Sequence, residues 1–322
     1  MDYLSAPQAN GAHYRDPGPS GITRALIESI RLNGKLFLDE MDQTPSWKWL
    51  NNVDTAFQLT DLPGDIGLMR RNSLEGFTRG AGVWWYDFGP SNQAGWWADT
   101  RLMAEITKLQ AVIEKYQRRD YAPAGDVLLI FDTEVFYYTG SIQGTDPVTD
   151  VRAVNRTIFE AWKCGAVVEN VHLRDIEQID LARFKVVMFA NTWLMAAAQR
   201  KFIRERVVDG RRHVVFQGFA GYCDGTSLRK ELTKELVRGK NVSHFENPPV
   251  TTAQWREICR AAGAHVCIEA DDIIHAGAGL LLVHTKDGGE KTIRLRSGKT
   301  VRSMMPPKHS IMLDAATGAE VV

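Results

Sequence analysis

The chain has 322 residues, enough for two or three domains. Lys plus Arg and Asp plus Glu both number 39, so the formal net charge is zero, without the basic excess typical of nucleic-acid-binding proteins. Hydrophobic residues make up 44% and charged residues 24%, as in folded globular domains. No apolar run approaches the roughly 18 residues that a membrane span needs. We therefore expect neither nucleic acid nor membrane among the partners.

The N-terminal stretch and the cysteines indicate the compartment. MDYLSAPQANGAHYRD has neither the basic start nor the apolar core of a signal peptide, so we expect a cytoplasmic protein. The four cysteines contain no C-x-x-C pair; they are Cys164, Cys223, Cys259 and Cys267. This spacing predicts buried, reduced thiols and no metal site, and we expect no organic cofactor.

The first region, residues 1–122, alternates predicted strands with predicted helices. The strands are predicted at residues 2–5, 35–40 and 82–88, the last as a buried strand, and the helices at 22–32, 72–79 and 100–116. Strands that alternate with helices imply a parallel α/β sheet or barrel.

A second α/β region, residues 123–269, follows the linker at 121–125. Its predicted strands open the segment 126–138 and lie at 166–171, 184–190 and 213–218, and its predicted helices lie at 150–162, 196–208, 228–237 and 251–262. Thr251 or Thr252 is expected to cap the last of these helices. The alternation is flavodoxin-like.

The last region, residues 270–322, contains short β segments and no predicted helix. Asp287-Gly288-Gly289 between two of these segments predicts a hairpin turn. The region therefore reads as a small antiparallel β domain.

Glu40 is the first candidate for chemistry. It closes the apolar strand 35–40, and in a (β/α)8 barrel the side chains at the C-terminal ends of strands line the active site. Glycoside hydrolysis uses two carboxylates that flank the bond. Asp42 has the same side-chain parity on an extended chain and competes for the role. An ordinary solvated Glu at the end of a strand is the alternative interpretation.

Tryptophan is concentrated in the first region. Six of the nine lie between residues 47 and 97: Trp47, Trp49, Trp84, Trp85, Trp96 and Trp97. Indole rings can line a sugar-binding site, because they stack on the apolar faces of sugar rings, or they can form an ordinary core. The sequence leaves both interpretations open.

Several segments together resemble a known family. DYLSAP, Tyr14-Arg15, SIRLNGKLFLDEMDQT, GFTRGAGVWWYDFG and GWWADTRLM resemble the last three βα units of family-42 β-galactosidases. DVLLIFDTEVFYYTG and VVFQGFAGYCDG resemble the trimerisation domain of these enzymes, and GGEKTIRLRSGKTV resembles their C-terminal β domain. The segments occur in the family's order and span nearly the whole chain.

The resemblance implies a three-part α/β architecture. Residues 1–122 would be the C-terminal portion of a (β/α)8 glycosidase barrel. Residues 123–269 would be a trimerisation-like domain with a flavodoxin-like, glutamine-amidotransferase-like α/β fold, and residues 270–322 the small antiparallel β domain. The implied activity is that of a retaining, β-galactosidase-like glycoside hydrolase, with a β-glycoside as substrate and a homotrimer as the assembly.

The resemblance also implies site residues. Glu40 takes the place of the catalytic nucleophile on barrel strand seven. Asp42 is the runner-up, because the family motif reads Met-Glu-Gln-Thr-Pro and residues 41–45 read MDQTP. Substrate-binding residues are expected at Tyr14, Arg15, Trp47, Trp84, Trp85 and Asp87.

One part of the family's site is missing from the sequence. The family's acid/base Glu follows an Asn on barrel strand four, and this sequence contains no Asn-Glu dipeptide. Barrel strands one to five have no counterpart, so we expect a fragment that is inactive alone. The alternative is a non-catalytic oligomerisation or carbohydrate-contacting module derived from such an enzyme.

Cys223 lies in a motif that suggests other chemistry. Residues 221–225 have the G-x-C-x-G form of a nucleophile elbow, and His244-Phe245-Glu246 could supply a base and its partner. The helix predicted at 228–237 lies between them, and no further strand is expected to bring His244 back to Cys223. We therefore expect a vestigial elbow without catalytic activity.

Overall fold

A computed structural model describes residues 2–8, 23, 25–42, 45–46, 61–87, 95–117, 124–139, 151–247 and 249–322. Contacts divide the chain into two compact units. Unit 1 comprises Met1–Pro123 and Asp272–Val322, and unit 2 comprises Ala124–Asp271. The C-terminal strands thus share a unit with the N-terminal region. Each unit is described by itself.

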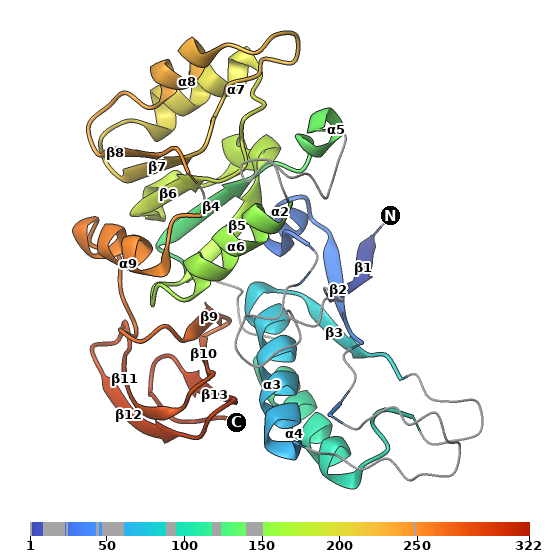
Figure 1. Ribbon diagram of the computed structural model, residues 1–322. Helices are drawn as coiled ribbons and strands as arrows, with labels where there is room; N and C mark the ends of the chain where they lie inside the picture. The colour runs from blue at the N-terminus through green and yellow to red at the C-terminus, as the bar shows by residue number, and fades with distance from the viewer. Residues whose placement is uncertain are drawn as a thin grey trace. The chain divides into compact units, whose positions relative to one another are not determined.

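Unit 1 begins with a parallel sheet of order β1-β2-β3 (Figure 1). Its elements in chain order are β1 (Tyr3–Pro7), α2 (Ile27–Leu32), β2 (Leu36–Met41), α3 (Leu62–Arg79), β3 (Gly82–Trp85) and α4 (Thr100–Tyr116). The predicted alternation of strands and helices is confirmed. The expectation that the third strand is buried is wrong, because Trp84 is exposed and the other residues of β3 are half-buried.

Helix α3 is longer than the pattern predicts. It begins at Leu62, whereas the predicted helix begins at 72. Asp61 caps the helix by accepting a hydrogen bond from the Gly64 N–H at 3.1 Å, and Pro63 lies in the first turn, where its missing N–H costs nothing. Pro63, Gly64 and Gly67 make this half look like a loop in sequence.

The C-terminal strands of unit 1 form two antiparallel sheets. The first has the order β13-β10-β9 and the second pairs β11 with β12; the strands are β9 (Ile273–Gly277), β10 (Leu280–Thr285), β11 (Gly289–Arg294), β12 (Thr300–Met305) and β13 (His309–Asp314). The hairpin predicted around residues 287–289 is wrong, because β10 and β11 belong to different sheets. Every residue of β10 is buried, and this central strand pairs with β13 along one edge and with β9 along the other.

Two glycines bring helix α3 against these strands. A Cβ on Gly67 would lie 1.9 Å from the Lys308 carbonyl oxygen, and a Cβ on Gly277 would lie 1.8 Å from the Thr78 carbonyl oxygen. Only glycine permits such an approach of two backbones. The shared core contains Met69, Leu74, Phe77, Leu102, Ile106, Leu109, Leu280, Leu282 and Met312.

Unit 2 is a five-stranded parallel sheet of order β5-β4-β6-β7-β8, the flavodoxin order. The strands are β4 (Val127–Phe131), β5 (Val168–His172), β6 (Val186–Phe189), β7 (His213–Gln217) and β8 (Val242–Phe245). The sequence did not predict β8, a half-buried edge strand with only two apolar residues. Every residue of β4 is buried.

Helices cover both faces of this sheet (Figure 1). The helices of unit 2 are α5 (Phe136–Thr139), α6 (Val151–Trp162), α7 (Ala197–Phe202), α8 (Lys230–Leu236) and α9 (Thr252–Ala261), with 3-10 turns at Leu173–Gln178 and Leu181–Arg183 and a π-helical turn at Ile203–Val207. Ile203, Val207 and Leu236 pack onto the sheet face formed by Leu128 and Ile130. None of the helices in the described part of the chain combines the length and apolarity of a bilayer-spanning segment.

Candidate active site

Glu40 lies at the C-terminal end of the central strand of the β1-β2-β3 sheet. Its residue pairs with Pro7 on β1 and with Trp84 on β3. Burial alternates along β2: Phe37, Asp39 and Met41 are buried, whereas Leu36, Leu38 and Glu40 are more exposed. Since successive side chains of a strand point to opposite faces, Glu40 belongs to the more open face of the sheet.

Trp84 lies on the same face. Its indole Nε1 donates a hydrogen bond to the Ser5 hydroxyl at 3.1 Å, and that hydroxyl donates to the Leu38 carbonyl oxygen at 3.0 Å. The indole therefore spans from β3 to β1, and 38% of Trp84 remains exposed. A fixed, partly open indole beside a carboxylate can stack on a sugar ring while the carboxylate faces its polar atoms.

Two further aromatic residues extend this surface. The Trp84 and Tyr86 rings meet edge to face at 6.0 Å, and the Tyr86 and Trp96 rings at 6.3 Å. Sequence reasoning did not select Tyr86 or Trp96 for the site. The signal for Tyr86 was its position two residues after Trp84, which gives both side chains the same parity.

Trp85 takes the other face of β3. It pairs with the buried Met41, and its ring meets that of Trp97 edge to face at 5.0 Å. Trp97 in turn donates from Nε1 to the Tyr86 carbonyl oxygen at 2.8 Å. Of the two adjacent tryptophans, the structure thus brings Trp84 beside Glu40 and packs Trp85 against the core.

The remaining predicted site residues are scattered or undescribed. The Asp42 N–H donates to the Glu40 carbonyl oxygen at 3.1 Å, so the chain turns where the strand ends. The side-chain alternation of an extended strand, which made Asp42 a competitor of Glu40, therefore does not extend to Asp42. Asp87 is exposed, and its carboxylate lies against Gly95, where a Cβ would stand 1.9 Å from Oδ2. Tyr14, Arg15 and Trp47 lie outside the described residues.

Behind Glu40, the buried face of β2 carries a polar anchor. The fully buried Asp39 accepts hydrogen bonds from Gln8 Nε2 at 3.1 Å and from the Thr23 hydroxyl at 2.9 Å. Burial raises the pKa of Asp39 to about 6, although both hydrogen bonds lower it. These bonds tie the segments at the two ends of the β1–α2 connection to β2, one residue before Glu40.

Among the residues that the structure describes, no group of three or more His, Cys, Asp or Glu side chains is placed to hold a metal ion.

In unit 2, Cys223 and His244 do not form a catalytic pair. The expectation that no strand returns His244 is wrong, since His244 lies on β8 beside Phe216 of β7. However, His244 Nε2 donates to the Gly218 carbonyl oxygen at 2.7 Å, and Cys223 Sγ accepts from the Gly225 N–H at 3.4 Å. Cys223 is buried and takes part in bridges to Leu194 and Leu228, so it does not occupy the exposed tip of a sharp turn.

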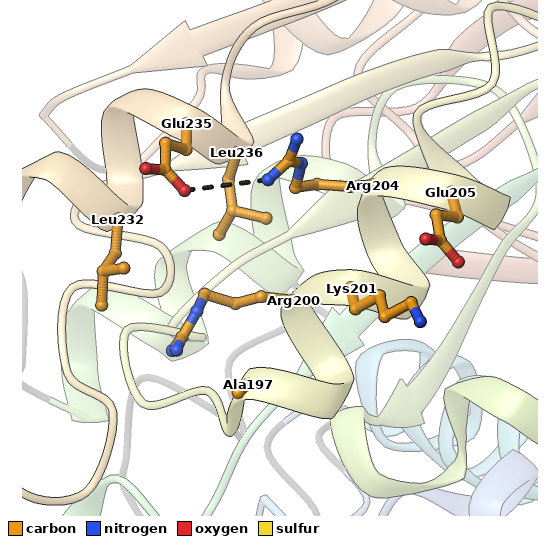
Figure 2. Close-up of a pocket in the computed structure, with 8 residues that line it drawn as sticks. All are labelled: Ala197, Arg200, Lys201, Arg204, Glu205, Leu232, Glu235 and Leu236. Atoms are coloured by element: carbon orange, nitrogen blue, oxygen red, sulfur yellow. Dashed lines mark ion pairs between the residues drawn. The ribbon is translucent and has the colours of Figure 1, made fainter.

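Unit 2 also has a cavity of about 430 Å³ between the α7 segment and α8 (Figure 2). It is lined by Ala197, Arg200, Lys201, Arg204, Glu205, Leu232, Glu235 and Leu236. Arg204 and Glu235 face each other across it at 3.7 Å. Positively and negatively charged side chains both line the cavity, so its charge favours neither an anionic nor a cationic ligand.

Comparisons with known proteins identify the fold. No family model and no curated protein matches the chain. Among solved structures, a β-galactosidase from the Antarctic haloarchaeon Halorubrum lacusprofundi is 12% identical, with a TM-score of 0.63 over 91% of this chain and 55% of that one. A cold-adapted β-galactosidase from Rahnella sp. R3 is 11% identical, with a TM-score of 0.61 over 89% and 56%.

Gan42B, a GH42 β-galactosidase from G. stearothermophilus, is similar to the chain over a comparable share of its length. It is 12% identical, with a TM-score of 0.56 over 90% of this chain and 54% of that one. The chain thus spans a little over half the length of the structures that it matches. Its fold is that of the corresponding part of GH42 β-galactosidases.

Proposed function

We propose that the chain is part of a retaining glycoside hydrolase that acts on β-linked glycosides, of the β-galactosidase type. The observation that carries this proposal is the placement of Glu40 at the C-terminal end of β2, level with the partly open indole of Trp84. In barrels of this kind the catalytic groups lie at the C-terminal ends of strands. The fold shared with GH42 β-galactosidases supports the same assignment.

In the proposed mechanism Glu40 is the nucleophile. Its carboxylate attacks the anomeric carbon, and a second carboxyl group about 5–5.5 Å away protonates the leaving oxygen. We assign that acid to barrel strands outside this chain. Within the described residues, β1 and β3 each pair on one side only, which leaves an edge at each end of the sheet for further strands. Trp84 would hold the sugar by stacking.

The test restores the missing strands. This chain is joined to the first five βα units of a GH42 barrel, and hydrolysis of an aryl β-galactoside is measured. The chain alone should show no turnover, because loss of a general acid costs roughly 10²–10⁴-fold and loss of positioning costs more. In the joined protein, Glu40→Gln should reduce kcat by at least about 10³-fold and abolish covalent trapping by a fluoro-sugar.

Asp42→Asn is the matched control, since it removes a neighbouring carboxylate from the same turn. It should lower activity only modestly and leave the trapped sugar on Glu40. If Asp42→Asn abolished trapping while Glu40→Gln kept near-normal turnover, the nucleophile would be Asp42.

The second candidate function is a non-catalytic oligomerisation module, and the self-contained core of unit 2 favours it. We propose a homotrimer in either case. Light scattering of the chain at tens of micromolar should give three times the monomer mass. A trimer whose joined form never hydrolyses or traps a glycoside would favour the module over the enzyme.

A further inference from the structure

Two cysteines far apart in sequence meet inside unit 2. The Sγ atoms of Cys164 and Cys259 lie 4.0 Å apart, and both residues are fully buried. Cys164 follows the end of α6 by two residues, and Cys259 lies on α9, the last helix of the unit. Both thiols are free in this structure. We propose that Cys164 and Cys259 are a redox modification site that forms a reversible disulfide and fastens α9 to the end of α6.

The backbone around Cys164 is held in one conformation. Gly165 has a φ of 85°, and a Cβ there would lie 2.0 Å from the Ile268 carbonyl oxygen. The Gly165 carbonyl oxygen accepts a hydrogen bond from the Cys267 N–H at 2.7 Å, and Ala166 bridges to Val266. The turn that carries Cys164 is therefore already ordered in the reduced protein, so forming a bond to Cys259 does not require ordering it first.

The first half of helix α9 is already hydrogen-bonded to the end of α6 and to the turn that follows it. Glu160 accepts hydrogen bonds from the Thr252 N–H at 2.8 Å and from the Thr252 hydroxyl at 2.6 Å. Arg256 donates to the carbonyl oxygens of Cys164 at 3.2 Å and Lys163 at 2.9 Å. Residues 252, 256 and 259 lie on one face of α9. The contact between the thiols of Cys259 and Cys164 therefore continues the same row of contacts along the helix.

The two thiols differ in acidity. The hydrogen bond from Cys259 lowers the pKa of Cys164, against the effect of burial, and the Arg256 charge lowers it further. The same pairing and burial raise the pKa of Cys259. Of the two, Cys164 is therefore the thiol that ionises more readily, and the thiolate is the form of cysteine that reacts with oxidants.

Forming a disulfide from two thiols requires a two-electron oxidant, and hydrogen peroxide, which is small and uncharged, can serve as that oxidant. The Cys164 thiolate attacks one peroxide oxygen, the O–O bond breaks, and a sulfenic acid and hydroxide form. The Cys259 sulfur then attacks the sulfenic sulfur, and the hydroxyl leaves with a proton as water. In sum, two thiols and one peroxide give one disulfide and two waters; the sulfurs are oxidised and the peroxide is reduced. A thiol reductant reverses the step.

The test uses the full chain in its reduced form, treated with hydrogen peroxide and digested without reductant. Mass spectrometry should find a peptide pair joined through Cys164 and Cys259, and the free thiols counted after denaturation should fall from four to two. Because the bond closes a loop across 95 residues, the midpoint of unit 2 unfolding should rise by about 5–10 °C and return on reduction.

Cys164→Ser and Cys259→Ser should each abolish both the joined peptide and the shift. Cys164→Ala, which leaves no buried hydroxyl, keeps the test valid if the serine variant fails to fold by circular dichroism. Cys223→Ser and Cys267→Ser are matched controls, since both residues are buried in the same unit, and they should keep the shift. Four surviving thiols, equal joining to Cys223 or Cys267, or oxidation of Cys164 only to sulfinic acid would overturn the proposal.

Discussion

At the scale of single residues, Glu75 is a buried ionisable side chain of unit 1. It is fully buried on α3, where Oε1 accepts a long hydrogen bond of 3.3 Å from Arg79 Nη1 and Oε2 has no hydrogen-bond partner. Burial raises the pKa of Glu75 to about 8; the Arg79 and Arg71 charges lower it, and Asp39 raises it. Burial lowers the pKa of His275, 3.9 Å from Oε2, well below its usual value. Glu75 therefore keeps its proton at neutral pH.

This proton makes the stability of unit 1 depend on pH. A raised carboxyl pKa in the folded state means that stability is fully present below the ordinary value near 4.5 and is lost as pH rises through about 8. Glu75→Gln keeps a neutral side chain and removes the titration. Between pH 5 and 8 the free energy of unfolding should therefore fall by about 3 kcal/mol less in the variant than in the parent chain.

Urea unfolding followed by tryptophan fluorescence at pH 5, 6, 7 and 8 measures the difference. Asp39, whose pKa is raised to about 6, also makes the free energy of unfolding fall with rising pH below about pH 6, and it does so equally in the parent and in Glu75→Gln. Parallel curves for the parent and Glu75→Gln would mean that Glu75 is ionised in the folded protein.

At the scale of elements, the start of α9 depends on a side-chain cap. Thr251 accepts a hydrogen bond from the Gln254 N–H at 3.3 Å, and Gln254 Oε1 accepts from the Thr251 N–H at 2.9 Å. Thr251→Ala should destabilise unit 2 by about 1 kcal/mol in chemical unfolding, because the Gln254 N–H at the helix end loses its acceptor. Thr251→Ser, which keeps the hydroxyl, should change stability by less than about 0.5 kcal/mol.

The contact between α3 and the C-terminal strands depends on Gly67. Alanine normally stabilises a helix interior relative to glycine by roughly 0.5–1 kcal/mol. Gly67→Ala should do the opposite and destabilise unit 1 by about 2 kcal/mol or more, since its Cβ would meet the Lys308 backbone.

Gly210→Ala is the matched control for Gly67→Ala. Gly210 has a φ of 78° and no atom within 4 Å of its Cβ position, so the substitution should cost only about 1 kcal/mol of backbone strain. Thermal or urea unfolding of both variants gives the comparison. A stabilised Gly67→Ala variant would show that α3 can move away from these strands.

At the scale of the whole molecule, the two parallel sheets should differ in local stability. The first three residues of β1 are exposed and Trp84 of β3 is exposed, whereas all residues of β4 and β6 are buried. Amide hydrogens in β1–β3 should therefore exchange at least about tenfold faster than those in β4 and β6, as measured by hydrogen–deuterium exchange with mass spectrometry. Equal protection of the two sheets would contradict this.

The local pattern of the sequence was sufficient for many elements. Helix α4 spans the predicted residues 100–116, the parallel strands of the first region follow from their apolar runs, and Thr251 caps α9 as expected. These features depend on periodicity and capping among residues within a few positions of each other, which the sequence displays directly. The candidate nucleophile Glu40 was found in the same way, as an acid at the end of an apolar strand.

Tertiary structure alone decided the rest, because it depends on contacts between residues distant in sequence. Strand β8 exists because β7 offers it an edge, and β10 pairs with β9 and β13, not with the β11 that follows it in sequence, because both of its edges are already occupied in that sheet. The first half of α3 is helical despite Gly67, since the Lys308 backbone packs where a side chain would be. Local periodicity likewise cannot predict the contact between Cys164 and Cys259, because only the packing of the sheet and its helices brings the end of α6 to α9.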